Sequence, residues 1–246
     1  VVAGLKSGTS TMTATLKSVN QGAHLQITNY DRGGPIFSGP QIQPWVCATK
    51  SGSPATVVVP GTGLSSTVTT RTSGLNADPT DAKCNAPAKF TYYYQPKALQ
   101  GTACTLGITG ANPWFIAYDP AARPTDAQIA DFTNDRGDTV KSMLRVELGT
   151  MDRGEYQVLT YFDPAQPWQP WAPQKGWNGK LYWKFGASAS GNRFQQGPGS
   201  SVFDANALAA GFMIANGQLT NHNDNNNEFL AAEQMRQAGI AGARVV

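Results

Sequence analysis

The chain has 246 residues and a formal net charge of +3, with 14% charged and 40% hydrophobic residues. Globular proteins carry about 25% charged residues, so this lightly charged composition with 26 glycines and 16 prolines favours strands and ordered loops over helices. Lysine and arginine are scattered without a basic run, which argues against nucleic-acid binding, and no window of about 18 apolar residues predicts a transmembrane segment.

Residues 1–30 alternate apolar and polar side chains, which is the period of a half-buried strand. The alternation predicts two strands, at 11–17 and 24–29. One hairpin is not a stable domain, so we interpret these residues as the tail of a β-sandwich-like region that joins a later sheet or lacks earlier strands. No secretory signal is visible, and Val1 is interpreted as a mature or trimmed start.

Residues 31–135 are rich in Gly, Pro, Ser and Thr, and we predict a loop-rich, disulfide-containing β region there. Strand patterns lie at 90–94 and 114–118. The segment that begins at Pro124 is typical of a short helix, with Thr125 or Asp126 as its cap.

The three cysteines are Cys47, Cys84 and Cys104. Cys47 and Cys84 both sit beside turns that contain Trp or Pro, and we predict a disulfide between them, which implies an oxidising compartment and a secreted or periplasmic location. Cys104 is then either a buried free thiol or the partner of a cysteine on another chain. No Cys-x-x-Cys spacing occurs and only two histidines are present, so neither a metal nor another cofactor is expected.

Residues 136–246 show the clearest pattern. The predicted elements are strands at 140–150 and 155–162, a strand at 180–185, a helix at 206–210 that Gly211 ends, a strand at 212–215, a helix at 228–238, and the start of a strand at 244–246. An antiparallel pair that leads into alternating strands and helices is how α/β-hydrolase sheets begin. We therefore predict an α/β fold class with a β-rich N-terminal region, in which residues 136–246 form the first half of an α/β-hydrolase-like domain with an incomplete sheet.

Two segments resemble a known family. Residues 27–47 contain Asp-Arg-Gly-Gly-Pro, and in residues 167–181 a Trp/Pro run precedes Trp-Asn-Gly-Lys. They are similar to a family of secreted bacterial proteins, a domain of unknown function with tannase- and feruloyl-esterase-like α/β-hydrolase character. The resemblance implies a Gly-Cys-Ser-Gly-Gly-Ser nucleophile elbow shortly after the helix at 228–238, so the serine, the triad acid and the histidine are expected beyond Val246. The chain is accordingly interpreted as truncated at both ends or as one piece of a processed protein.

The small residues after the strand at 180–185 are the first candidate site. Gly186, Ala187 and Ser188 resemble the small-residue loop of the family, and small residues let backbone N–H groups approach an oxyanion closely. The alternative is a flexible Gly/Ser turn. Ser188 is a poor candidate for the nucleophile, because an elbow requires a following helix and residues 192–199 are poor helix material.

His222 follows the strand at 212–215, and strand ends line the ligand sites of open α/β sheets. We consider a role at the mouth of the site, with a solvent-exposed loop histidine as the alternative. His24 is interpreted as a structural residue of its strand. Residues 221–228 are rich in Asn and Asp, which is a feature of calcium loops. They lack the Gly at position six and the Glu at position twelve of such a loop, so turn and helix-cap chemistry explains them better.

A group of tryptophans and a group of carboxylates each allow a structural as well as a functional interpretation. Trp168, Trp171 and Trp177 could stack on an aromatic or sugar ligand, but packing under Pro-rich loops is the commoner use of such residues. The carboxylates that flank the hairpin at 140–162 could suggest glycoside hydrolysis, and solvation of the hairpin turn is the preferred interpretation; they are Glu147, Asp152 and Glu155.

The sequence therefore favours part of a secreted serine hydrolase that acts on carboxylic esters of phenolic or polyester type, with the nucleophile outside this chain. Its expected partners are a small-molecule or polymeric ester substrate and a companion chain or downstream C-terminal half. The alternative is a non-catalytic extracellular binding or assembly protein on a hydrolase-like scaffold.

Overall fold

The computed structural model of the protein describes most of the chain between residues 8 and 218. The described residues are 8–16, 18, 21–29, 45–52, 54–58, 65–69, 73–102, 114–151, 153–169, 172–184, 194–198 and 201–218. The remaining residues lie outside this description, and with them the predicted helix at 228–238, the predicted strand at 244–246 and Cys104.

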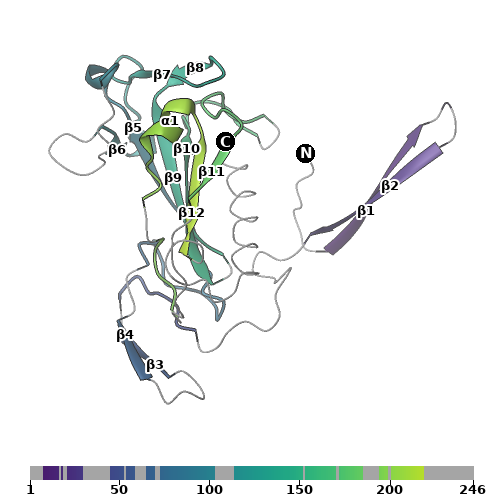
Figure 1. Ribbon diagram of the computed structural model, residues 1–246, viewed down its shortest axis with the longest axis vertical. Coiled ribbons are helices and arrows are strands. Elements are labelled where there is room, and N and C mark those ends of the chain that lie inside the picture. Colours follow the sequence, from purple (N-terminus) through teal and green to yellow (C-terminus); the bar gives the residue numbers. More distant parts are fainter. Residues whose placement is uncertain are drawn as a thin grey trace.

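A six-stranded sheet forms the body of the molecule, with the strand order β11-β12-β10-β9-β5-β6 (Figure 1). Its pairs are antiparallel except for β11 and β12, which run parallel. The strands are β5 (Lys89–Tyr94), β6 (Ile116–Tyr118), β9 (Met143–Met151), β10 (Gly154–Tyr161), β11 (Leu181–Trp183) and β12 (Met213–Gly217).

The hairpin β9–β10 lies at the centre of the sheet, because it carries apolar side chains on both faces. Alternate residues point to opposite faces of a strand, so Leu159 and Tyr161 face one core while Tyr156 and Val158 face another. All four side chains are buried. Burying one such side chain contributes about 1.5–3 kcal/mol, and these positions anchor the elements that cover the sheet.

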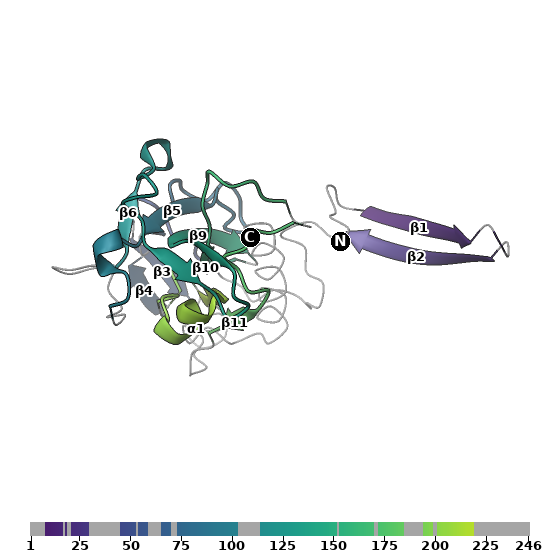
Figure 2. The same cartoon turned by 90° about the horizontal axis from the view of Figure 1, so that it is seen from above.

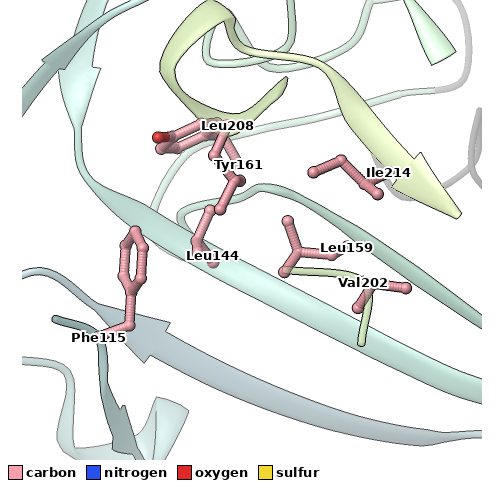
Figure 3. Close-up of a cluster of buried hydrophobic side chains, with 7 residues drawn as sticks. All are labelled: Phe115, Leu144, Leu159, Tyr161, Val202, Leu208 and Ile214. Carbon is pink, nitrogen blue, oxygen red and sulfur yellow. The ribbon is translucent and has the colours of Figure 1, made fainter. Parts of the chain in front are cut away.

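The larger core lies between the sheet and the segment that leads into β12 (Figure 3). Helix α1 (Ala205–Ala210) inserts Leu208 into this core. Asp204 caps the start of α1 by accepting a hydrogen bond from the backbone of Ala207, and Gly211 ends the helix in the left-handed conformation with φ of 87°. The predicted helix with a Gly stop is confirmed.

The predicted strands at 140–150, 155–162, 180–185 and 212–215 are confirmed as elements, but the predicted α/β class is wrong. Among the described residues there is a single α-helix, α1, which has six residues. The described residues between β10 and β11 form turns and a loop, as the Trp/Pro run predicted, so no crossover helix joins these two strands. The prolines there remove backbone donors that a helix needs; they include Pro164, Pro167 and Pro173. The described chain is β-rich with a mixed sheet, and it is not an α/β-hydrolase sheet.

Among the described residues, three hairpins lie outside the main sheet. They are β1 (Gly8–Leu16) with β2 (Gln21–Asn29), β3 (Pro54–Val58) with β4 (Ser65–Thr69), and β7 (Asp131–Thr133) with β8 (Thr139–Lys141). The first confirms the predicted N-terminal hairpin and extends away from the body (Figure 2). Residues 120–122 and 97–99 form short 3-10 turns, and the helix predicted after Pro124 is only a turn.

Candidate functional site

Strands β11 and β12 end at the same edge of the sheet. Trp183 is paired with Ala215 in the parallel register, so the chain leaves both strands on the side where β10 begins. Carboxyl ends of neighbouring parallel strands are where open sheets place ligand sites. This edge is therefore the candidate functional site.

Three buried glutamines connect the edge to segments that are distant in sequence; they are Gln195, Gln196 and Gln218. Gln218 follows β12 directly, and its side-chain oxygen accepts a hydrogen bond of 2.9 Å from the backbone of Gln196. Its side-chain nitrogen donates to the carbonyl oxygen of Phe194 at 2.7 Å. Because the side chain forms both bonds, residues 194–198 are fixed against the end of β12.

Gln195 extends this connection to the disulfide. Its side-chain nitrogen donates to the carbonyl of Cys84 at 3.1 Å, and its side-chain oxygen accepts from the backbone of Ala48 at 3.2 Å. Cys47 and Cys84 are bonded, with their Cα atoms 5.2 Å apart, which confirms the predicted pairing. The disulfide therefore holds together the two backbone segments that Gln195 binds.

Glu155 is the titratable group buried beneath the edge. It lies near the start of β10, is fully buried, and donates its backbone N–H to Gln218. Burial disfavours the charged form and raises the pKa of Glu155 to about 8. A carboxylic acid that is neutral at pH 7 can hold a proton next to a reacting group.

Two neighbours shape the space around Glu155. A Cβ atom on Gly197 would lie 3.7 Å from Oε2 of Glu155, so the backbone passes close to the carboxyl group. Arg153, in the turn that precedes β10, stacks its guanidinium 4.7 Å from the ring centre of Trp45. Residues 45–48 and 194–198 thus cover the start of β10.

The interpretation of the hairpin carboxylates as solvated turn residues was wrong for two of them. Glu155 is 0% exposed and Glu147 is 6% exposed, and Glu147 accepts a hydrogen bond from the hydroxyl of Tyr156. Asp152 lies outside the described residues. Apolar residues at both odd and even positions of 156–162 were the available signal, since apolar side chains on both faces are typical of a strand buried on both faces.

The predicted site residues follow these strand ends in the sequence. Gly186, Ala187 and Ser188 come after β11, and His222 comes after β12; all four lie outside the described residues, so their roles remain predictions. The calcium alternative at 221–228 lies outside them as well.

The other predicted residues have structural roles where they are described. His24 lies in β2 and its ring nitrogen is 3.0 Å from the hydroxyl of Thr13. Trp168 packs edge-on against Phe162, and Trp177 packs against the core and donates to the carbonyl of Lys180 at 2.9 Å. These tryptophans pack, as the preferred interpretation held, and Trp171 lies outside the description.

In the described part of the chain, no three His, Cys, Asp or Glu side chains gather as metal ligands. No helix in that part is long and apolar enough to cross a membrane.

Comparison with known proteins identifies the family. The model of a tannase-like family of unknown function (DUF6351) matches residues 1–238, which confirms the resemblance seen in residues 27–47 and 167–181. No curated protein and no solved structure gives a match. Since the match covers nearly the whole sequence, the chain belongs to this tannase-like family of unknown function.

Proposed function

We propose that this protein is a hydrolase of carboxylic esters, with the reaction at the sheet edge where β11 and β12 end. The observation that carries the proposal is the convergence at this edge of two parallel strand ends and the buried acid Glu155. Membership of a tannase-like family supports it independently of the geometry.

The loop that follows β11 supplies the oxyanion donors in this mechanism. Backbone N–H groups of Gly186, Ala187 and Ser188 stabilise the negative charge that develops on the ester carbonyl when a serine attacks it. One such donor contributes about 3 kcal/mol to the transition state. In this proposal the attacking serine lies outside Val1–Val246. It displaces the alcohol of the ester to form an acyl-enzyme, and water then hydrolyses the acyl-enzyme to release the carboxylic acid.

The protein acts outside the cytoplasm in this proposal, on phenolic or polyester substrates. The Cys47–Cys84 disulfide supports a secreted or periplasmic location, because such bonds persist in oxidising compartments.

Fluorophosphonate labelling of the native protein, followed by peptide mass spectrometry, tests the proposal. The expected result is one labelled serine outside Val1–Val246, together with hydrolysis of p-nitrophenyl acetate that the label abolishes. A protein that takes no label and hydrolyses no short acyl ester would overturn the proposal. A label on Ser188 would support the hydrolase activity but would identify Ser188 as the nucleophile.

A proline scan tests the oxyanion loop. Proline at 186, 187 or 188 removes one backbone N–H, and at least one of these variants is expected to lower kcat about 100-fold. The matched controls are Gly186→Ala, Ala187→Ser and Ser188→Ala, which keep the N–H. Equal activity in all six variants would exclude this loop.

One observation favours a second function, a non-catalytic extracellular binding or assembly protein. The hairpin β1–β2 pairs Met12 with Leu25, and these side chains are 47% and 59% exposed. Exposed apolar residues on a two-stranded ribbon are typical of surfaces that another chain covers. Absence of labelling together with self-association that Met12→Ser/Leu25→Ser disrupts would favour this function.

A further inference from the structure

A cleft of about 540 Å³ lies at the end of β10 that is remote from Glu155. Strand β8 and Asp131 of β7 form one wall, and the loop segments 163–167 and 173–176 form the other. Tyr161 on the floor lies six positions after Glu155 along an extended strand, so the cleft is about 20 Å from the candidate site. It is a separate feature of the fold.

The loop wall is held in place by one side chain. Gln174 is buried, accepts the backbone N–H of Asp163 at 2.7 Å and donates to the carbonyls of Asp163 at 2.7 Å and Gln166 at 3.1 Å. The bridge between Gln169 and Ala172 closes the loop further along. Because this wall is already ordered, it loses little conformational entropy when a ligand binds.

The floor of the cleft is apolar and tightly packed. The ring of Tyr161 stacks on Phe132 at 3.8 Å, with 6° between the ring planes. A Cβ atom on Gly176 would lie 2.6 Å from the Cβ of Tyr161, so the loop backbone lies directly on the floor. Pro167 and Pro173 line the cleft as well and are exposed. Because Tyr161 and Phe162 are only 3% and 4% exposed, the two exposed prolines supply the apolar surface that a flat ligand group could contact.

The charges around the cleft sum to a surplus of positive charge. Lys141 and Lys97 each bind Asp131 at 2.7 Å, and hydrogen bonds from both lysines hold the pKa of Asp131 below its usual value. The guanidinium of Arg123 binds both carboxylate oxygens of Asp163, at 2.9 and 2.7 Å.

Arg123 also binds Asp126 at 2.8 Å. Lys175 lines the cleft and is exposed. The charge of Lys175 also acts on Asp138, which Arg136 binds at 2.8 Å. With this pair included, five cations surround four carboxylates, and Lys175 is the exposed cation that a ligand in the cleft could reach. A surplus of positive charge around a cleft attracts anions.

We propose that this cleft binds a small organic monocarboxylate whose body is a flat apolar ring. Pro167 and Pro173 take the ring, and Lys175 on the same wall takes the carboxylate. The volume lies within the range of about 300–1,000 Å³ that is usual for small-molecule sites. The inference does not depend on the proposed esterase activity, because it uses none of the residues at the ends of β11 and β12.

Titration by ligand-observed NMR with three probes tests the ligand class. Benzoate is expected to bind with a Kd on the order of millimolar or tighter, whereas acetate lacks the ring and benzyl alcohol lacks the charge, so each is expected to bind at least about tenfold more weakly. Absence of benzoate binding, or equal binding of benzoate and benzyl alcohol, would overturn the proposal.

Charge variants of one lining residue test the place of binding. Gln166 is exposed, so substitution of its side chain leaves the loop wall intact. Gln166→Glu is expected to weaken benzoate binding and Gln166→Arg to strengthen it, each by about three- to fivefold. Lys175→Gln is expected to weaken binding to a similar degree. Lys50→Gln, which removes an exposed lysine outside the cleft, is the matched control, and an equal response of all four variants would place the binding elsewhere.

Labelling separates this proposal from the proposed function. Benzoate binding is expected to persist in protein whose reactive serine carries a fluorophosphonate. Loss of benzoate binding on labelling would assign the ligand to the reaction site and overturn the separate site.

Discussion

Gln218 accepts a hydrogen bond of 2.9 Å from the backbone N–H of Gln196, and this bond joins the end of β12 to a segment that precedes α1. The same side chain donates to Phe194. The candidate site is therefore built on a buried amide side chain that supplies hydrogen-bond partners to the backbone of Phe194 and Gln196.

Replacement of Gln218 by leucine should destabilise the fold. The substitution leaves the N–H of Gln196 and the carbonyl of Phe194 buried without their partner, which costs about 2 to 3 kcal/mol. Urea denaturation followed by tryptophan fluorescence measures the free energy of unfolding. Gln169→Leu is the control, because the exposed side chain of Gln169 forms no such contact; equal free energies for the two variants would contradict the role of Gln218.

The buried acid predicts an unusual dependence of stability on pH. The pKa of Glu155 is about 8 in the folded protein against 4.5 in the unfolded chain, so between these values the folded state binds a proton that the unfolded state has lost. Stability is therefore fully present below about pH 4.5 and decreases as pH rises towards 8, by up to about 1.4 kcal/mol per pH unit from this group.

Glu155→Gln removes this titration. We expect the variant to lose the dependence and to exceed the native protein in stability at pH 9, as measured by urea denaturation at pH 5, 7 and 9. The native protein at pH 5 is the internal reference, since its Glu155 is then protonated. Parallel pH profiles for the two proteins would show that Glu155 is ionised in the folded state.

The sequence predicted those parts of the fold that local patterns determine. The strand patterns at 140–150 and 155–162 identified the central hairpin, and the glycine after the short helix identified Gly211 as its end. The burial of Glu155 escaped prediction because residues 45–48 and 194–198, which cover it, are distant in the sequence. The α/β class was wrong because local patterns predict which strands are present but not how they pair: β10 pairs antiparallel with β12, and only β11 and β12 run parallel.

Reduction of the Cys47–Cys84 disulfide should destabilise the chain through its unfolded state. The two cysteines are 37 residues apart, and opening a loop of this length costs about 3 to 4 kcal/mol in the chain-entropy estimate. Cys47→Ala/Cys84→Ala should match the native protein measured in dithiothreitol, with Cys104→Ser in both backgrounds to prevent exchange. If reduction leaves the midpoint of denaturation unchanged, the segments that Gln195 binds are held together without the disulfide.

The ion pair between Arg123 and Asp163 should contribute far more than the exposed pairs. Asp163 is buried, with 9% of its side chain exposed, and Arg123→Met would leave its carboxylate without the guanidinium, which costs about 3 to 5 kcal/mol. The matched control is Arg136→Met, because Arg136 binds Asp138 at the surface with half of its side chain exposed, and such pairs contribute less than about 1 kcal/mol. Asp163→Asn combined with Arg123→Met should recover much of the loss, because it removes the buried charge. The free energies of unfolding at pH 7 show whether the loss of stability comes from the burial of Asp163 or from charge attraction alone. Charge attraction alone predicts equal losses for Arg123→Met and Arg136→Met.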